Sequence, residues 1–230
     1  MKNTNRFIVL EGLDGSGKST QVRLFQQYLK DNNIPYRYIH FPRTDSPVYG
    51  ELVAMFLQGK FGALDKVDPY LVALLYAGDR KDASEMIRSW LKEGLMVLVD
   101  RYVYSNIAFQ CAKLENKEEQ EKLRKWILDL EFSYHNIPAP DLNILLTVPF
   151  AFTEKNLTQR RKGSDRNYLK GADDIHEADL GFQKRVREAY LWQLDLEPNF
   201  IGIDCADTNG QILDKNAIHK KIIDKLNSSL

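Results

Sequence analysis

The sequence predicts an α/β fold in which a five-stranded parallel sheet is covered by helices on both faces. Five short apolar runs are bounded by turn residues, and they lie at residues 6–11, 36–41, 95–100, 141–148 and 199–204. Between and after these runs, apolar residues recur at helical spacing over about 17–31, 47–59, 68–93, 117–134, 149–161, 174–194 and 212–228. Strands that alternate with helices are joined by right-handed crossovers, so they form a mostly parallel sheet.

The composition favours one domain without a strongly charged partner surface. The chain has 230 residues, which suits one domain over 1–230, and its 32 basic residues balance its 32 acidic ones. This balance gives no overall field that would attract nucleic acid or an anionic membrane. Cys111 and Cys205 stand far apart, which is typical of reduced thiols. The polar start at 1–6 and the short apolar runs predict neither a signal peptide nor a membrane span, so we expect a cytoplasmic protein.

The first strand and the first helix are joined by a phosphate-binding pattern. Residues 12–19 read Gly-Leu-Asp-Gly-Ser-Gly-Lys-Ser, directly after the apolar run at 7–10. In such a loop, backbone N–H groups bind a polyphosphate, Lys18 reaches the β- and γ-phosphates, and the Ser19 hydroxyl ligates Mg²⁺. Asp14 is expected to face an acceptor hydroxyl or the water around the metal, although a turn-stabilising aspartate is the alternative. The loop residues expected to bind ATP are Gly12, Leu13, Asp14, Gly15, Ser16, Gly17, Lys18, Ser19 and Thr20.

Charged residues also follow the second and third strands. Phe41, Pro42 and Arg43 end the second run, where Arg43 can bind a second anion. Asp100 and Arg101 end the third run, and an aspartate there, beside a phosphate loop, is typical of a residue that orders Mg²⁺. The planar guanidinium of Arg101 suits a phosphoryl group in transfer. Because parallel strands end at one edge of the sheet, we expect these residues to converge with the phosphate loop.

Two further segments have more than one interpretation. Tyr76 and Arg80 are four residues apart, so both project from one helix face. By spacing alone, Tyr76 suits core packing and Arg80 suits a surface salt bridge. The basic segment 162–173 has no clear period, and it is either a mobile lid or an ordinary solvated loop.

Taken together, these motifs resemble the thymidylate kinases over nearly the whole chain. The resemblance rests on the segments at 7–14, 41–43, 76–80, 100–106 and 140–142. It implies a P-loop nucleoside-monophosphate kinase that transfers phosphate from ATP to dTMP, with Mg²⁺ held by Ser19 and Asp100. Members of the family are usually homodimers, so the resemblance also implies a dimer.

The resemblance implies roles for residues on the acceptor side. Asp14 would contact the sugar 3′-hydroxyl, Arg43 would bind the monophosphate, and Arg101 would bridge it to the donor. Phe109 would lie near the sugar, where a ring disfavours a ribose 2′-hydroxyl. The residues implied to bind the acceptor are Asp14, Phe41, Arg43, Tyr76, Arg80, Arg101, Ser105, Asn106, Phe109, His176 and Glu177.

For the base, the resemblance implies that Tyr76 stacks on thymine, Arg80 donates to a base carbonyl, and Asn106 lies nearby. Position 76 is usually phenylalanine in the family, so the site must also accommodate the hydroxyl group of Tyr76. His176 and Glu177 resemble the Tyr-Glu pair that the family places near the substrate phosphate and the metal. A glutamate stabilised by a helix dipole is the alternative for Glu177.

A second departure concerns the phosphate loop. Some family members carry an arginine there, whereas this loop has Gly15 and Ser16. The resemblance then implies that an arginine of a lid at about 160–174 supplies charge in the transition state. The candidates are Arg160, which would lie near ATP, and Arg161 and Arg166.

Other functions fit less well. A deoxynucleoside kinase would need a carboxylate after the second strand, where this chain has Arg43. That kinase is still the nearest alternative among enzymes, together with another nucleoside-monophosphate kinase. A GTPase switch protein would need an Asn-Lys-x-Asp motif, and the sequence Asn-Lys-Glu-Glu at 116–119 lacks its last residue.

Overall fold

The computed structural model describes residues 7–158, 169, 174–177 and 179–228. A five-stranded sheet runs through its centre in the order β2-β3-β1-β4-β5, and all four strand pairs are parallel. The strands are β1 (Phe7–Glu11), β2 (Tyr36–His40), β3 (Met96–Asp100), β4 (Leu142–Thr147) and β5 (Phe200–Asp204). The predicted fold class is therefore confirmed, and each strand lies within one residue or two of its predicted range.

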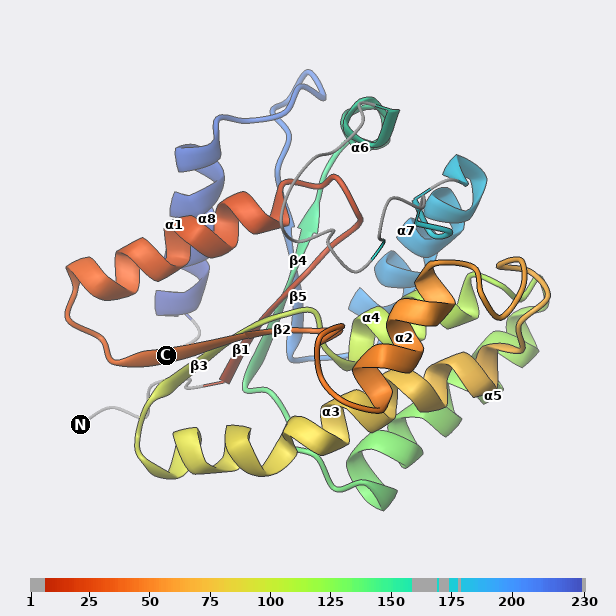
Figure 1. The fold of residues 1–230 in the computed structure, drawn as a ribbon. Coiled ribbons are helices and arrows are strands. Elements are labelled where there is room, and N and C mark those ends of the chain that lie inside the picture. The colour runs from red at the N-terminus through yellow and green to blue at the C-terminus, as the bar shows by residue number, and fades with distance from the viewer. Residues whose placement is uncertain (1–6, 159–168, 170–173, 178, 229–230) are drawn as a thin grey trace.

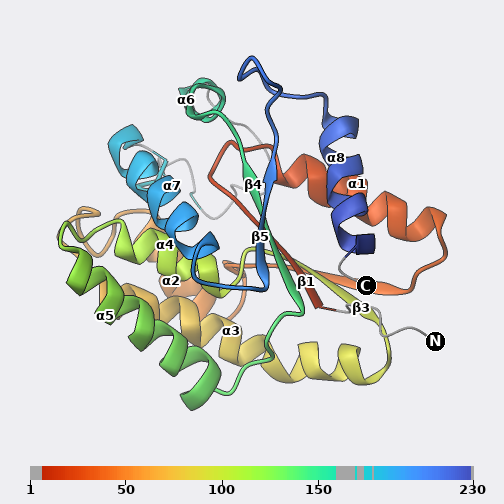
Figure 2. The same cartoon turned by 180° about the vertical axis from the view of Figure 1, so that it is seen from behind.

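Helices cover both faces of the sheet (Figures 1 and 2). Their bounds are α1 (Lys18–Asp31), α2 (Tyr49–Leu57), α3 (Pro69–Lys92), α4 (Val103–Cys111), α5 (Lys117–Leu128), the π-helix η1 (Asp129–Tyr134), α6 (Phe150–Thr158), α7 (Leu180–Leu194) and α8 (Lys215–Ser228). One face carries α1 and α8, and the opposite face carries α3, α4, α5 and α7.

Strand β1 shows why the sheet needs two apolar layers. Phe7 and Val9 belong to the core beneath α3, α4 and α7, whereas Ile8 and Leu10 belong to the core beneath α1 and α8. Successive side chains of a strand point to opposite faces, so a central strand that is covered on both sides must be apolar throughout. Strand β1 ends at Glu11, directly before the phosphate loop at 12–19.

Helix α4 is the one element among the described residues that the periodicity did not predict. All nine of its residues are buried, because it is enclosed by α3, α5 and α7. A helix buried on every side has no polar face and hence no amphipathic pattern. The predicted helix at 117–134 changes to π geometry at Asp129, and the helix predicted from 174 begins only at Leu180.

The late start of α7 has a local cause. The Asp179 side chain accepts a hydrogen bond from the N–H of Phe182 at 2.9 Å and so forms the N-cap of the helix.

None of the helices among the described residues is long and apolar enough to cross a bilayer.

Candidate active site

The carboxyl ends of β1, β2 and β3 open into one cavity of about 970 Å³. The predicted site residues that line it are Asp14, Lys18, Ser19, Phe41, Arg43, Tyr76, Arg80, Asp100, Arg101, Ser105, Asn106, Phe109, His176 and Glu177. These residues come from segments that are far apart in the sequence. The expected convergence at one sheet edge is therefore present. Of the predicted ATP-binding residues that the structure describes, Gly12, Leu13, Gly15, Ser16, Gly17 and Thr20 do not contribute to this lining.

The phosphate loop turns sharply between β1 and α1. Gly15 and Gly17 have φ of 74° and 85°, in the left-handed region that side chains disfavour. A Cβ on Gly15 would also come within 3.2 Å of the backbone oxygen of Thr153. Gly17 is the N-cap of α1 and brings no side chain to the first turn. Backbone N–H groups at the start of a helix bind anions, so this geometry suits a phosphate chain.

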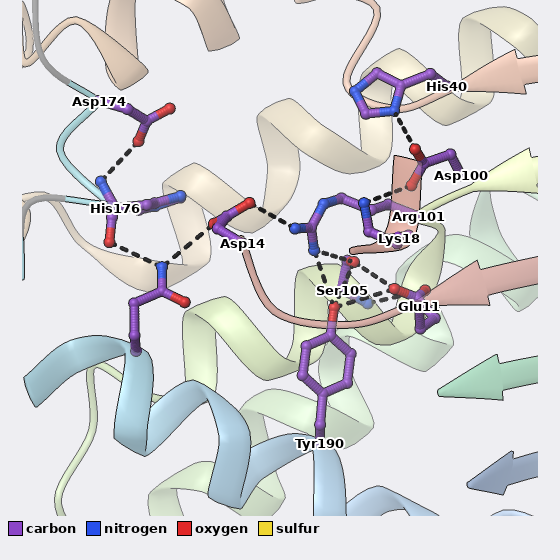
Figure 3. A network of polar contacts seen from close by, with 11 residues as sticks. Glu11, Asp14, Lys18, His40, Asp100, Arg101, Ser105, Asp174, His176 and Tyr190 are labelled. Atoms are coloured by element: carbon purple, nitrogen blue, oxygen red, sulfur yellow. Dashed lines mark hydrogen bonds and ion pairs between the residues drawn. The ribbon is translucent and has the colours of Figure 1, made fainter. Parts of the chain in front are cut away.

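Lys18 and Asp100 form a buried ion pair at the base of the cavity. The Lys18 Nζ lies 2.7 Å from Asp100 Oδ1, and His40 Nδ1 lies 3.3 Å from the other carboxylate oxygen (Figure 3). Burial lowers the pKa of Lys18, and the charge of Arg101 adds to this effect. Although burial opposes ionisation of Asp100, the charge of Lys18 holds the pKa of that carboxyl well below its usual range. Asp100 is thus ionised at neutral pH.

Arg101 occupies the middle of a polar network. Its Nη2 donates to Asp14 Oδ1 at 2.7 Å, and its Nη1 donates to Ser105 Oγ and to the Tyr190 hydroxyl, each at 3.2 Å (Figure 3). The backbone of Arg101 has φ of 66°, which is uncommon for a residue with a side chain. One carboxylate oxygen of Asp14 thus contacts Arg101, and the other accepts a hydrogen bond from Gln183 Nε2 at 3.2 Å.

Arg43 is held at the far side of the cavity by two carboxylates. Its Nε donates to Asp79 Oδ1 at 2.8 Å, and its Nη2 donates to Asp82 Oδ2 at 2.6 Å. The backbone N–H of Arg43 also donates to Asp79, at 2.8 Å. Asp79 is fully buried, so the turn after β2 is anchored to α3. This anchoring fixes the guanidinium of Arg43 at the cavity wall.

Arg80 forms a buried ion pair, which corrects the surface salt bridge that its spacing favoured. Arg80 and Glu131 are 1% and 0% exposed, and the guanidinium bonds both carboxylate oxygens, at 2.6 and 2.5 Å. Asn106 Nδ2 joins them, donating to Glu131 at 3.1 Å. Core packing alone does not describe Tyr76 either, because its half-buried ring lines the cavity.

The family model for thymidylate kinase matches residues 10–216, most of the chain. The chain belongs to the thymidylate kinase family. A probable thymidylate kinase of Thermococcus kodakarensis is 31% identical over 222 residues, which cover 94% of this chain and 95% of that protein. The thymidylate kinase of Mycobacterium tuberculosis strain H37Rv is 30% identical, with 80% of this chain and 83% of that protein covered. The solved thymidylate kinase of Candida albicans matches with a TM-score of 0.70 and 25% identity, over 98% of this chain and 93% of that one.

The kinase has oxygen donors where a magnesium ion would be bound. Ser19 and Asp100 both line the cavity beside Lys18. Mg²⁺ is bound by oxygen ligands, through one or two side chains together with substrate phosphates and water. A hydroxyl and an ionised carboxylate match this donor set. Among the described residues, no group of three or more His, Cys, Asp or Glu side chains could hold a metal ion.

His176 lies in an aromatic environment at the cavity wall. Its ring centroid is 4.8 Å from that of Phe109 and 5.5 Å from those of Phe56 and Phe182. Burial lowers the pKa of His176 to about 3, and the charge of Lys113 contributes. The imidazole is therefore neutral at physiological pH and packs as an aromatic ring. Glu177 also lines the cavity, but it precedes α7 and does not belong to its first turn.

Several side chains of the site had no strong sequence signal. Gln110 is fully buried, and neither of its side-chain polar atoms has a hydrogen-bond partner among the described residues. It lines the cavity, as does the buried carboxylate of Asp174. Glu11, Gln183 and Tyr190 complete the network around Asp14 and Arg101. From the sequence, Gln110 could be noticed by its closeness to Asp100 and Arg101, and Glu11 as a charged residue at the end of an apolar strand.

The proposed lid falls almost entirely outside the part of the chain that the structure describes. Arg160, Arg161 and Arg166 are among the residues that are not described. Their predicted roles therefore stay predictions.

Proposed function

We propose that this kinase transfers the γ-phosphoryl group of ATP to dTMP, which gives ADP and dTDP. The observation that supports this most is the place of Arg101, which lines the same cavity as Lys18 and Arg43. Lys18 belongs to the loop that suits the donor phosphates, and Arg43 suits the acceptor phosphate. Arg101 would then contact the phosphoryl group as it passes between them.

The reaction needs positioning and charge more than a strong base. A phosphate monoester is largely ionised at neutral pH, so an oxygen of dTMP can attack the γ-phosphorus while the bond to the ADP oxygen breaks. Lys18 and Arg101 would hold the negative charge of the transferring group, and Ser19 and Asp100 would hold Mg²⁺. When bound, the metal neutralises phosphate charge and aligns the donor. An arginine of the 160–174 segment would add positive charge that stabilises the transition state. Arg161 and Arg166 are the candidates, and Arg160 would lie near ATP.

Another part of the cavity wall suits a pyrimidine base. Tyr76 offers a ring for stacking, and Arg80 and Asn106 offer polar groups beside it. The amide of Gln110 adds a donor and an acceptor that are not used within the described structure. Phe109 would lie against the sugar, where it excludes a 2′-hydroxyl, and Asp14 would reach the 3′-hydroxyl.

Several broader features belong to the same proposal. The chain would act as one kinase domain over 1–230, with the phosphate loop at 12–19 and a lid at about 160–174. It would work as a cytoplasmic homodimer in the synthesis of dTTP and would bind neither nucleic acid nor membrane.

An acceptor panel tests the assignment. The purified chain is incubated with ATP and Mg²⁺ and with dTMP, dUMP, dCMP or thymidine, and the initial rate of ADP release is measured for each. We expect the highest kcat/KM with dTMP. Faster phosphorylation of thymidine than of dTMP would overturn the proposal, because it would place a hydroxyl and not a phosphate at the acceptor position.

A further inference from the structure

Helix α7 reaches the phosphate loop from a distant part of the chain. Gln183 and Tyr190 lie seven residues apart, about two turns, and so on the same face of α7. Gln183 Nε2 donates to Asp14 at 3.2 Å, and the Tyr190 hydroxyl lies 3.2 Å from Arg101 Nη1. Both partners of the Arg101–Asp14 ion pair are thus held by one helix, which lies outside the segments on which the resemblance rests.

The Tyr190 hydroxyl also belongs to a fully buried cluster. It lies 2.6 Å from Ser105 Oγ and 3.0 Å from Glu11 Oε2 (Figure 3). Glu11 accepts in addition from Ser105 Oγ at 2.5 Å and from the backbone N–H groups of Tyr102 and Ser105, at 2.9 and 3.2 Å. The last two belong to the start of α4, whose dipole favours a carboxylate. Glu11 therefore lies within hydrogen-bond distance of four donor groups and has no contact with solvent.

The direction of these hydrogen bonds decides whether Arg101 faces the lone pairs or the protons of the two hydroxyls. Each hydroxyl has one proton to donate. Burial raises the pKa of Glu11, and the hydrogen bond from Ser105 and the charge of Arg101 oppose this shift. When it is ionised, Glu11 can only accept, so Ser105 donates a hydrogen bond to it and Tyr190 donates to Glu11 or to Ser105. Both hydroxyl oxygens then turn lone pairs toward Arg101 Nη1, which donates to each of them. The charge of Glu11 thereby orients two acceptors toward a residue that it does not touch.

We propose that Glu11 and Tyr190 are positioning residues that fix the Arg101 guanidinium between the two phosphates. Tyr190 contacts Arg101 directly, and Glu11 acts through the hydroxyls of Ser105 and Tyr190. This inference rests on the proposed function, because it assumes that Arg101 contacts the transferring phosphoryl group. Arg101 has an uncommon backbone conformation and a long side chain, so its head group needs contacts on both sides to stay in place. Asp14 provides one side, and the hydroxyl pair provides the other.

The first test compares two tyrosines that pack on the same ring. Tyr190 and Tyr104 are both buried, and their ring centroids lie 6.4 and 4.6 Å from that of Phe200. The Tyr104 hydroxyl bonds Asn199, away from the cavity. Tyr190→Phe should lower kcat about tenfold with a small change in the KM for ATP, whereas Tyr104→Phe should keep the wild-type kcat. Equal kcat values for the two variants, at similar melting temperatures, would overturn the proposal.

A second variant tests the role of charge. In Glu11→Gln, the amide NH₂ must donate toward the hydroxyls. One hydroxyl can still donate to the other, so at least one hydroxyl proton turns toward Arg101 and repels it. We expect kcat to fall by about 100-fold, more than in Tyr190→Phe. A folded Glu11→Gln variant with the wild-type kcat would contradict this orientation.

A double-mutant cycle shows whether Tyr190 acts through Arg101. Arg101→Lys keeps a positive charge but removes the Nη1 donor. Tyr190→Phe should therefore lower kcat much less in the Arg101→Lys background than in the wild type. An equal fold-change in both backgrounds would show that Tyr190 acts independently. The cycle is measured with the best acceptor of the panel, so a different acceptor would overturn the proposed function without removing this test.

Discussion

The buried ion pair between Arg80 and Glu131 gives a quantitative prediction about stability. Glu131→Gln keeps the shape of the side chain but removes its charge. The new NH₂ group would face the Arg80 nitrogens, which now lie 2.6 and 2.5 Å from the carboxylate oxygens. With both residues almost completely buried, the arginine could not recover its charge compensation from water.

The size of the effect follows from this burial. Removing one partner of a buried pair costs about 3–5 kcal/mol, because the other charge stays behind without compensation. In a chain of this size each kcal/mol lowers the melting temperature by about 2–4 °C, so the variant should melt about 6–20 °C below the wild type. Replacing both residues, as Arg80→Met with Glu131→Leu, should restore most of the stability. That double variant should still show a raised KM for dTMP, since Arg80 lines the cavity.

The assay is thermal and denaturant unfolding with a matched control. Glu118→Gln makes the same change in an ion pair with Lys122 whose side chains are 73% and 67% exposed. It should cost less than about 1 kcal/mol. A Glu131→Gln variant that unfolds within about 1 kcal/mol of Glu118→Gln would refute the reasoning.

Three further predictions concern the cavity. Arg43→Ala should raise the KM for dTMP about tenfold or more and leave the KM for ATP nearly unchanged; unchanged dTMP kinetics would remove Arg43 from the site. Gln110→Leu should raise the free energy of unfolding by about 1 kcal/mol, since it removes buried polar atoms that have no hydrogen-bond partner among the described residues, and should weaken dTMP binding measured by calorimetry. His176 has a pKa near 3 when folded and 6.5 as a free side chain, so the unfolded chain takes up the extra proton between these values. Between about pH 8 and pH 5 the wild type should therefore lose about 2 kcal/mol of stability that His176→Phe retains, and parallel losses would contradict this.

Local sequence patterns predicted much of the fold and the part of the site that suits the phosphate donor. The apolar runs at 7–10 and 96–99 are the central strands, and the glycines of 12–17 give the loop its turns. These features depend on neighbouring residues, because alternation of side chains and backbone freedom act over a few positions. Helix α4 escaped prediction for the same reason, since its burial on all sides comes from elements that are distant in sequence.

By itself, the sequence determined that this chain is a kinase with a phosphate loop, and it supplied the charged residues at the strand ends. Only the tertiary structure decided which of those charged side chains form ion pairs or hydrogen bonds, and with which partners. Glu11 and Tyr190 are 179 residues apart and Arg80 and Glu131 are 51 apart, so no local period joins either pair. The first pair forms only when α7 packs on α4, and the second forms only when η1 packs beside α3, and both contacts exclude water. In that dry environment a buried charge must have a partner, and this requirement brings distant residues together.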